Sequence, residues 1–98
     1  MGRLQPDFTP AFSRAVKRLN RRHVDLAPLE EVIELVCRND ASATSELRRR
    51  HNMHTLKGSW LGSHGCHVAN AGGWPLVWRS NDTVAAFQRT GSHDELFR

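Results

Sequence analysis

The spacing of apolar residues changes partway along this 98-residue chain, and this change limits the folds open to it. In the first part, apolar residues recur every three or four positions, as they do on one face of a helix. After a small, polar stretch at 39–45 that period disappears, and Trp, Gly and β-branched residues become frequent. Narrow helical stripes cannot enclose a core by themselves, so they need a sheet to pack on. The sequence therefore predicts an α+β fold.

The first part carries the signals of two helices. Thr9 and Pro10 are a typical N-cap and first helical residue, and they predict a helix over about 10–22. Asp25 is a typical cap for a second helix, which we expect to end near Arg38. Each helix has one apolar stripe, formed by Phe12, Ala15, Val16 and Leu19 in the first and by Leu29, Val32, Ile33 and Val36 in the second. The two together predict an N-terminal helical hairpin.

The second part predicts a loop and then a sheet of about four strands. Residues 39–45 have the composition of a loop, and short runs typical of strands follow at 56–61, 63–69, 74–79 and 83–89. The last two connections are typical of hairpins, which join antiparallel strands. Trp74, Leu76 and Trp78 alternate along one strand, so we expect its apolar face to receive the helices. Residues 1–98 should form a single domain.

The charge balance favours a polyanionic partner. Fourteen Lys and Arg against ten Asp and Glu give a formal net charge of +4, and the sequence pI is about 10.0. Nucleic acid is the natural candidate, although an acidic protein partner stays open. The basic residues form two clusters, Arg14, Lys17, Arg18, Arg21 and Arg22 in the first helix and Arg48, Arg49 and Arg50 further on. No apolar stretch approaches the roughly 20 residues of a membrane span, which predicts a cytoplasmic protein with reduced cysteines.

Histidine is the residue type most suggestive of chemistry in this chain. Five of the six histidines lie after residue 50. Cleavage of RNA without a metal requires a base for the 2′-hydroxyl proton and an acid for the leaving 5′-oxygen. The ordinary pKa of histidine, about 6.5, makes both protonation states available near neutrality. We therefore expect His54, His67 and His93, which lie at or near predicted strand ends, to form one site.

Several short motifs resemble those of a known toxin family. They are HTLKGSWLG at 54–62, CHV at 66–68, RTGSH at 89–93 and LF at 96–97, together with DL at 25–26 and LEEVI at 29–33 in the second predicted helix. These motifs resemble the YafQ family, which belongs to the RelE/ParE-like superfamily of bacterial toxin–antitoxin systems. The resemblance extends over most of the chain.

The resemblance implies a RelE-like α+β fold, in which a helical hairpin packs on a curved antiparallel sheet. It implies a ribosome-dependent, metal-independent mRNA interferase, an endoribonuclease that needs no cofactor, cleaves mRNA in the ribosomal A site and so inhibits translation. The implied partners are the ribosome, mRNA and a cognate antitoxin, with no membrane. The antitoxin complex would bind operator DNA through the antitoxin, in the bacterial cytoplasm.

The resemblance also assigns roles to single residues. By motif, His54 and His67 correspond to family histidines that transfer protons, and His93 to one that contacts the scissile phosphate or orients the RNA. Phe97 matches a C-terminal aromatic near the substrate, and Trp74 matches a tryptophan that follows an acid in the family pattern.

Two basic residues near these motifs are candidates for binding a substrate phosphate. A guanidinium matches phosphate geometry well, so Arg89 can place its planar donors on a phosphate, and Lys57 can do so with less directionality.

One position departs from the family pattern. The family has His-Val-Glu-Pro-Asp-Trp, whereas this chain runs HVANAGGW over 67–74, with two extra residues and no carboxylate. Gly73 stands directly before Trp74, where the family has its acid. The departure predicts slower catalysis or the use of other groups, if the acid takes part.

Three other readings remain open at this point. A toxin of the same fold can act on a protein target such as DNA gyrase, as ParE relatives do, and a weakened toxin can still bind its antitoxin. A zinc site is the third, formed by His64, Cys66 and His67 with His51 or His54, but the spacing is poor because neighbouring strand residues point to opposite faces.

Overall fold

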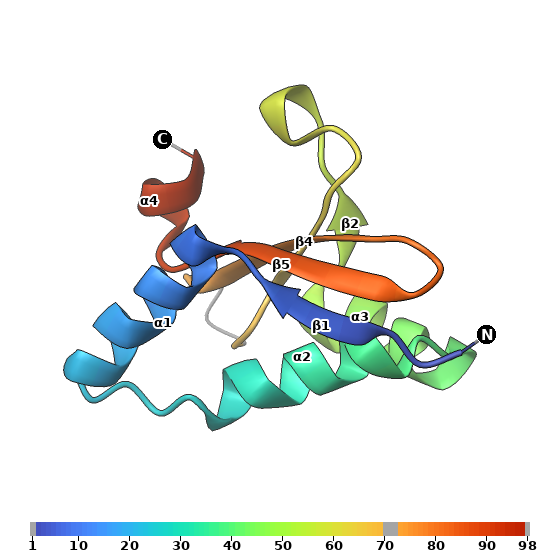
Figure 1. Cartoon of the computed structure of the whole chain (residues 1–98), viewed down its shortest axis with the longest axis horizontal. Coiled ribbons are helices and arrows are strands. Elements are labelled where there is room, and N and C mark those ends of the chain that lie inside the picture. Colours follow the sequence, from blue (N-terminus) through green and yellow to red (C-terminus); the bar gives the residue numbers. More distant parts are fainter. Residues whose placement is uncertain (1, 70–72, 98) are drawn as a thin grey trace.

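The computed structural model describes residues 2–69 and 73–97 and shows one five-stranded sheet with helices on its faces (Figure 1). The strand order is β1-β5-β4-β3-β2. The strands are β1 (Gln5–Phe8), β2 (His54–Thr55), β3 (His64–His67), β4 (Pro75–Ser80) and β5 (Val84–Thr90). The helices are α1 (Pro10–Arg21), α2 (Ala27–Arg38), α3 (Ala41–His51) and α4 (His93–Phe97), with a short 3₁₀ helix, η1 (Gly58–Trp60). The prediction of an α+β fold is confirmed.

The two predicted helices are present. The expected cap of the first is confirmed, whereas the N-cap of α2 is Leu26, which makes no side-chain cap hydrogen bond, and not the predicted Asp25. The Thr9 hydroxyl oxygen accepts a hydrogen bond from the Phe12 amide at 3.1 Å, which begins α1. A carboxylate oxygen of Asp25 accepts one from the Ala27 amide at 3.0 Å, at the start of α2. Helix α2 ends where Asn39 adopts a left-handed conformation with φ 53°.

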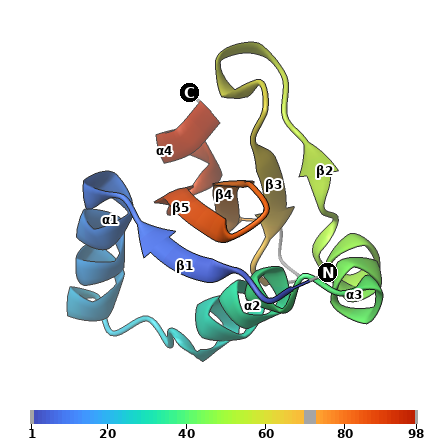
Figure 2. The same cartoon turned by 45° about the vertical axis from the view of Figure 1, so that its right-hand side comes forward.

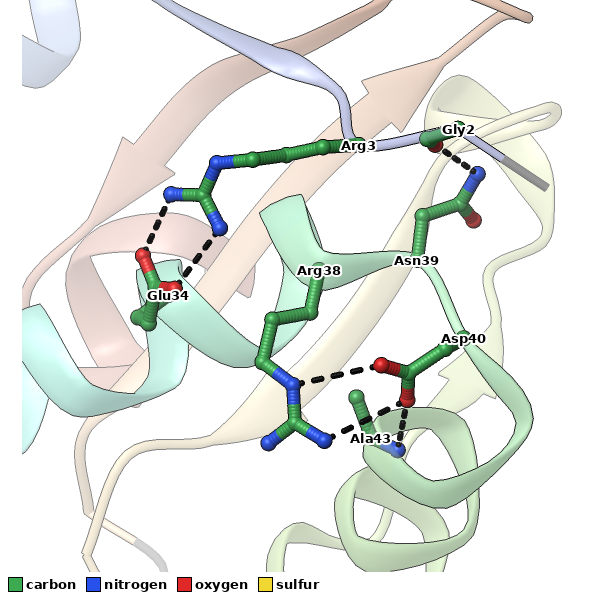
Figure 3. Close-up of polar contacts among 7 residues, drawn as sticks. All are labelled: Gly2, Arg3, Glu34, Arg38, Asn39, Asp40 and Ala43. Atoms are coloured by element: carbon green, nitrogen blue, oxygen red, sulfur yellow. Dashed lines mark hydrogen bonds and ion pairs between the residues drawn. The ribbon is translucent and has the colours of Figure 1, made fainter.

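A third helix stands where the sequence predicted a loop over 39–45. Asp40 caps α3, because its carboxylate accepts a hydrogen bond from the Ala43 amide at 2.7 Å (Figure 3). The buried side of α3 consists of Ala43, Leu47 and His51, each four residues from the last. This stripe contains one large apolar residue, so the apolar period was too weak to reveal the helix.

The same junction fixes the N-terminal segment (Figure 3). Arg3 donates two hydrogen bonds to the Glu34 carboxylate, at 2.7 and 2.6 Å. The Asn39 side-chain amide donates to the Gly2 carbonyl at 3.1 Å, and the Leu4 amide donates to the Cys37 carbonyl at 2.8 Å. The chain is thereby guided from α2 toward β1.

The sheet differs from the predicted one in two respects. Its fifth strand, β1, was not predicted, and it pairs with β5 in parallel, so the sheet is not wholly antiparallel. The expected strand at 56–61 is instead the two-residue β2 followed by η1. Gly58 and Gly62, with φ of +66° and +91°, turn the chain out of a strand conformation. The other three predicted strands are confirmed, and the connection at 70–72 lies outside the described residues.

The core lies between the sheet and the first three helices. Leu76 and Trp78 of β4 and Phe87 of β5 are buried against apolar residues of α1, α2 and α3, as the alternation along 74–79 predicted. In contrast, α4 and the segment after β2 stand on the other side of the sheet (Figures 1 and 2). Within the described residues, no helix is long and apolar enough to cross a membrane.

Candidate active site

The structure brings together the three histidines that the sequence singled out. His54, His67 and His93 line one pocket of about 200 Å³, together with Leu56, Gly65, Cys66 and Pro75. They come from β2, β3 and the start of α4. Two of its lining residues, Leu56 and His93, belong to the segment after β2 and to α4, which stand on the same side of the sheet (Figure 2). Its lining contains no aspartate or glutamate among the described residues.

His54 is exposed at the edge strand, where it pairs with Gly65 of β3. Its Nδ1 lies 2.8 Å from the Asn52 carbonyl oxygen. A carbonyl oxygen only accepts hydrogen bonds, so Nδ1 carries the hydrogen and Nε2 is the nitrogen that can exchange a proton with a bound group.

His67 is half-buried at the end of β3, opposite Pro75 of β4. Its neighbour Cys66 is in the core cluster, which places the two side chains on opposite faces of the sheet. Burial raises the pKa of the Cys66 thiol to about 12, so this thiol is neutral near pH 7. Cys66 therefore does not compete with the histidines as a proton acceptor.

His93 is the first residue of α4, which an interaction between Ser92 and Glu95 holds in place. The Glu95 carboxylate accepts a hydrogen bond from the Ser92 amide at 3.0 Å, and the Glu95 amide donates to the Ser92 hydroxyl at 3.2 Å. Hydrogen bonding from the Ser92 amide and from the Ser92 side chain holds the pKa of the Glu95 carboxyl below its usual range. Glu95 also lies 3.7 Å from Arg18, which ties α4 to α1.

Arg89 reaches the site face of the sheet through an irregularity in β5. Trp78 pairs with Phe87 and Val77 pairs with Arg89, so Gln88 has no partner on β4 and forms a β-bulge. In a regular strand, Arg89 would share the core-facing side with Phe87, which lies two residues earlier. The bulge turns Arg89 to the side of Val77, whose neighbour on β3 lines the pocket.

Arg89, Lys57 and Trp74, the predicted substrate residues whose side chains the structure describes, are not in the pocket lining. Lys57 is exposed just before η1. Trp74 is half-buried against the core cluster, and its indole N–H donates to the Thr90 hydroxyl at 3.0 Å. The side chain of Phe97 lies outside the described part of the structure. Gly73 is exposed, and a Cβ built there would meet nothing within 4 Å.

Sequence reasoning considered His51 only as an alternative zinc ligand and missed its contact with the site. His51, the last residue of α3, is 6% exposed, and its Nδ1 lies 2.8 Å from the His67 carbonyl oxygen. The only signal for it was the spacing of Ala43, Leu47 and His51, which places the histidine on the buried side of a helix that the composition did not predict.

The described residues do not form the zinc site that was considered as an alternative. No group of three or more His, Cys, Asp or Glu side chains in residues 2–69 and 73–97 could hold a metal ion. His64 faces the core side, where its ring lies 5.7 Å from that of Trp78, whereas His67 faces the pocket. Cys37 and Cys66 are both free and buried.

Comparison with known proteins gives one consistent result. The family model for the bacterial toxin YafQ of type II toxin–antitoxin systems matches residues 4–98. The mRNA interferase toxin YafQ of Escherichia coli K12 is 32% identical over 91 residues, which cover 93% of this chain and 92% of that protein.

Solved structures agree with the family match. The crystal structure of YafQ from E. coli BL21(DE3) has a TM-score of 0.83 at 28% identity, covering 97% of this chain and 99% of that one. YafQ in the E. coli DinJ-YafQ toxin-antitoxin complex has a TM-score of 0.80 at 29% identity, with coverage of 98% and 99%. A copper-bound mutant toxin from Helicobacter pylori has a TM-score of 0.82 at 28% identity, with coverage of 96% and 99%. The chain therefore belongs to the YafQ family of bacterial type II toxin–antitoxin toxins.

Proposed function

We propose that this toxin is an mRNA interferase, an endoribonuclease that cleaves mRNA on the ribosome and so inhibits translation. The observation that carries the proposal is the single pocket lined by His54, His67 and His93. The YafQ relatives from E. coli are named mRNA interferase toxins, and the net charge of +4 suits a ribosome and its message as partners.

In the proposed reaction, one of His54 and His67 is the base and the other is the acid. The base takes the proton of the 2′-hydroxyl, the 2′-oxygen attacks phosphorus, and the bond to the 5′-oxygen breaks as the acid protonates it. The products are a 2′,3′-cyclic phosphate and a 5′-hydroxyl. His93 contacts the scissile phosphate or orients the RNA, and Arg89 supports the phosphate from beside the pocket.

The remaining predicted substrate contacts belong to the same proposal. Lys57 is exposed and directly precedes η1, and in this proposal its ammonium binds a phosphate of the RNA backbone. Trp74 and Phe97 are assigned to substrate binding because they match aromatic residues in the motifs of the family. The hydrogen bond from Trp74 to Thr90 gives its indole a structural role as well.

The partners of the toxin follow from its family. A cognate antitoxin binds and neutralises it, as the E. coli complex of DinJ with YafQ illustrates for a relative. The resulting complex binds operator DNA through the antitoxin, and the toxin acts in the bacterial cytoplasm, where ribosomes are.

The test is cleavage of a defined message by the purified toxin on programmed ribosomes. A chelator selective for zinc is present, so that the ribosome keeps its Mg²⁺. We expect cleavage with a 2′,3′-cyclic phosphate end, and a loss of about 10²-fold or more in His54→Ala and His67→Ala. His23→Asn is the control, because His23 is an exposed residue in a left-handed turn outside the pocket, with φ 60°.

Two results would contradict this proposal. Cleavage that stops with the chelator and returns with zinc would overturn the metal-independent reaction. Intact message together with inhibition of a protein target such as DNA gyrase would instead favour a toxin of the ParE type.

A weakened toxin is the second candidate function, and the absence of a carboxylate from the described pocket lining favours it. Such a toxin would bind its antitoxin with full affinity while cleaving message slowly. The cleavage rate and the antitoxin affinity, measured on the same preparation, separate the two candidates.

A further inference from the structure

We propose that His51 is a positioning residue for His67, which it holds through the backbone of β3. This inference rests on the proposed function, because it gives His51 a role in the reaction that the pocket histidines perform. The contact itself is a hydrogen bond between His51 Nδ1 and the His67 carbonyl oxygen, at 2.8 Å. The carbonyl accepts, so Nδ1 is the donor.

The sheet explains why the His67 carbonyl needs this donor. The Val68 amide donates to the Trp74 carbonyl at 2.8 Å, so Val68 directs its backbone groups toward β4. Backbone groups of successive residues point to opposite sides of a strand, and therefore those of His67 point toward β2. The register of β2 with β3 would place Asn52 opposite His67, but β2 begins only at His54.

Asn52 cannot supply the missing hydrogen bond from its own backbone. It is the left-handed C-cap of α3, with φ 52°, and its amide donates to the Leu47 carbonyl. The preceding residue, His51, takes its place with a side-chain N–H. The imidazole thus extends the β2–β3 ladder by one hydrogen bond, at the residue that carries a predicted proton-transfer group.

The same end of α3 also contacts the other predicted proton-transfer residue. The Asn52 carbonyl accepts a hydrogen bond from His54 Nδ1 at 2.8 Å. The C-terminal end of α3, formed by His51 and the C-cap Asn52, therefore holds both residues. It holds His67 through the backbone carbonyl and His54 through Nδ1. Both contacts limit the relative movement of two groups that must meet one substrate.

The burial of His51 argues against a role in packing alone. The residue is 6% exposed, and among the described residues its buried Nε2 has no hydrogen-bond partner. An unpaired buried nitrogen destabilises a fold, so a leucine of similar size would pack there without that cost. What the imidazole adds is the N–H directed at the His67 carbonyl.

The test compares variants that keep or remove a donor at the Nδ1 position. His51→Leu fills the space without a donor, and His51→Asn places an amide N–H where Nδ1 lies. His51→Gln is the matched control, because its amide lies where Nε2 was. The measurements are the single-turnover cleavage rate at saturating ribosome–mRNA complex, the half-saturating concentration of that complex, and thermal unfolding.

We expect His51→Leu to lower the cleavage rate by about tenfold or more, because a displaced group is costly in a preorganised site. Its half-saturating concentration should not change, since His51 does not reach the substrate. Its unfolding temperature should stay close to that of the wild type, because the lost hydrogen bond to the His67 carbonyl and the removed unpaired Nε2 offset each other. His51→Asn should restore most of the rate, and His51→Gln should not.

Wild-type cleavage by His51→Leu would overturn the inference, as would equal rates for His51→Asn and His51→Gln. If the leucine variant fails to fold, the comparison of Asn with Gln still decides. His67→Ala separates this failure from that of the proposed function. If His67→Ala is slow while the His51 variants are fast, only the positioning role falls, whereas a fast His67→Ala overturns the proposed function and this inference with it.

Discussion

Gly73 is a single position at which this chain differs from its family in a way that bears on chemistry. A side chain is sterically possible there, because a Cβ would meet nothing within 4 Å and the residue is exposed. We predict that Gly73→Asp raises the rate of message cleavage by about tenfold or more. Gly73 is two residues before Pro75 of the pocket lining, and a carboxylate close to a histidine stabilises its protonated form. Single-turnover cleavage on programmed ribosomes measures the effect.

Gly73→Asn is the control for this prediction, because it has the same size without the charge. The thermal unfolding temperatures of both variants should match that of the wild type. An unchanged rate in Gly73→Asp would mean that the histidines of this chain work without a carboxylate at that position.

At the scale of residues, the motif resemblance identified the pocket histidines but did not identify His51, which we propose positions one of them. His54, His67 and His93 are in recognisable local contexts, so their convergence was predictable. His51 acts through a hydrogen bond across 16 positions, which depends on where β2 begins and α3 ends. Because no local pattern in the sequence encodes that contact, it could be found only in three dimensions.

Among the secondary-structure elements, α3 buries Leu47 as its only large apolar side chain, so we expect its stability to depend on its cap. The hydrogen bond from the Ala43 amide, together with the nearby Arg38 guanidinium, holds the pKa of the Asp40 carboxyl below its usual range. A lowered folded-state pKa adds stability above the unfolded value, and this stability is lost as the pH falls through the folded one. We predict that Asp40→Ala lowers the unfolding temperature at pH 7, by a margin that shrinks below about pH 4.

Thermal unfolding followed by circular dichroism across this pH range provides the measurement. Asp40→Asn is the control, because asparagine also caps helices but does not titrate. A difference between Asp40→Ala and wild type that stays constant from pH 7 to the acid limit would contradict the role of the ionised cap.

An element could be predicted from the sequence when its side chains form a clear apolar pattern. Helices α1 and α2 have strong apolar stripes, α1 has a standard Thr9 cap, and β4 has a clear alternation, so these elements were found. Strand β1 is the stretch QPDF, whose four residues are all exposed and include a proline that only an edge strand tolerates. Its pairing with β5 joins residues about 80 positions apart, and short-range patterns do not reveal such contacts.

Considered as a whole molecule, the toxin carries an uneven distribution of positive charge. In α1, Arg14, Lys17 and Arg21 are exposed and have no ion-pair partner among the described residues. We predict that replacing all three with glutamine weakens binding to ribosomes and reduces its dependence on salt, because fewer counterions are released. Sedimentation with ribosomes at several salt concentrations measures both.

The control for this prediction is Arg50→Gln in α3. Arg50 lies 3.3 Å from Glu46 and 3.9 Å from Glu31, so its charge is already partly balanced. It should change ribosome binding little. If each charge removed from α1 weakened ribosome binding as much as the one removed by Arg50→Gln, only the net charge would matter, and the position of α1 would not.

The pairing of β1 with β5 and the position of His93 in α4 have a consequence for the time at which the toxin becomes active. The first strand has no partner until residues 84–87 have been made, and the pocket lacks its third histidine until residue 93 has been made. A growing chain whose later residues are still inside the ribosomal exit tunnel therefore cannot assemble the pocket. Synthesis and toxicity are separated in time, and this delay is an interval in which an antitoxin translated nearby can meet the chain before the pocket is complete.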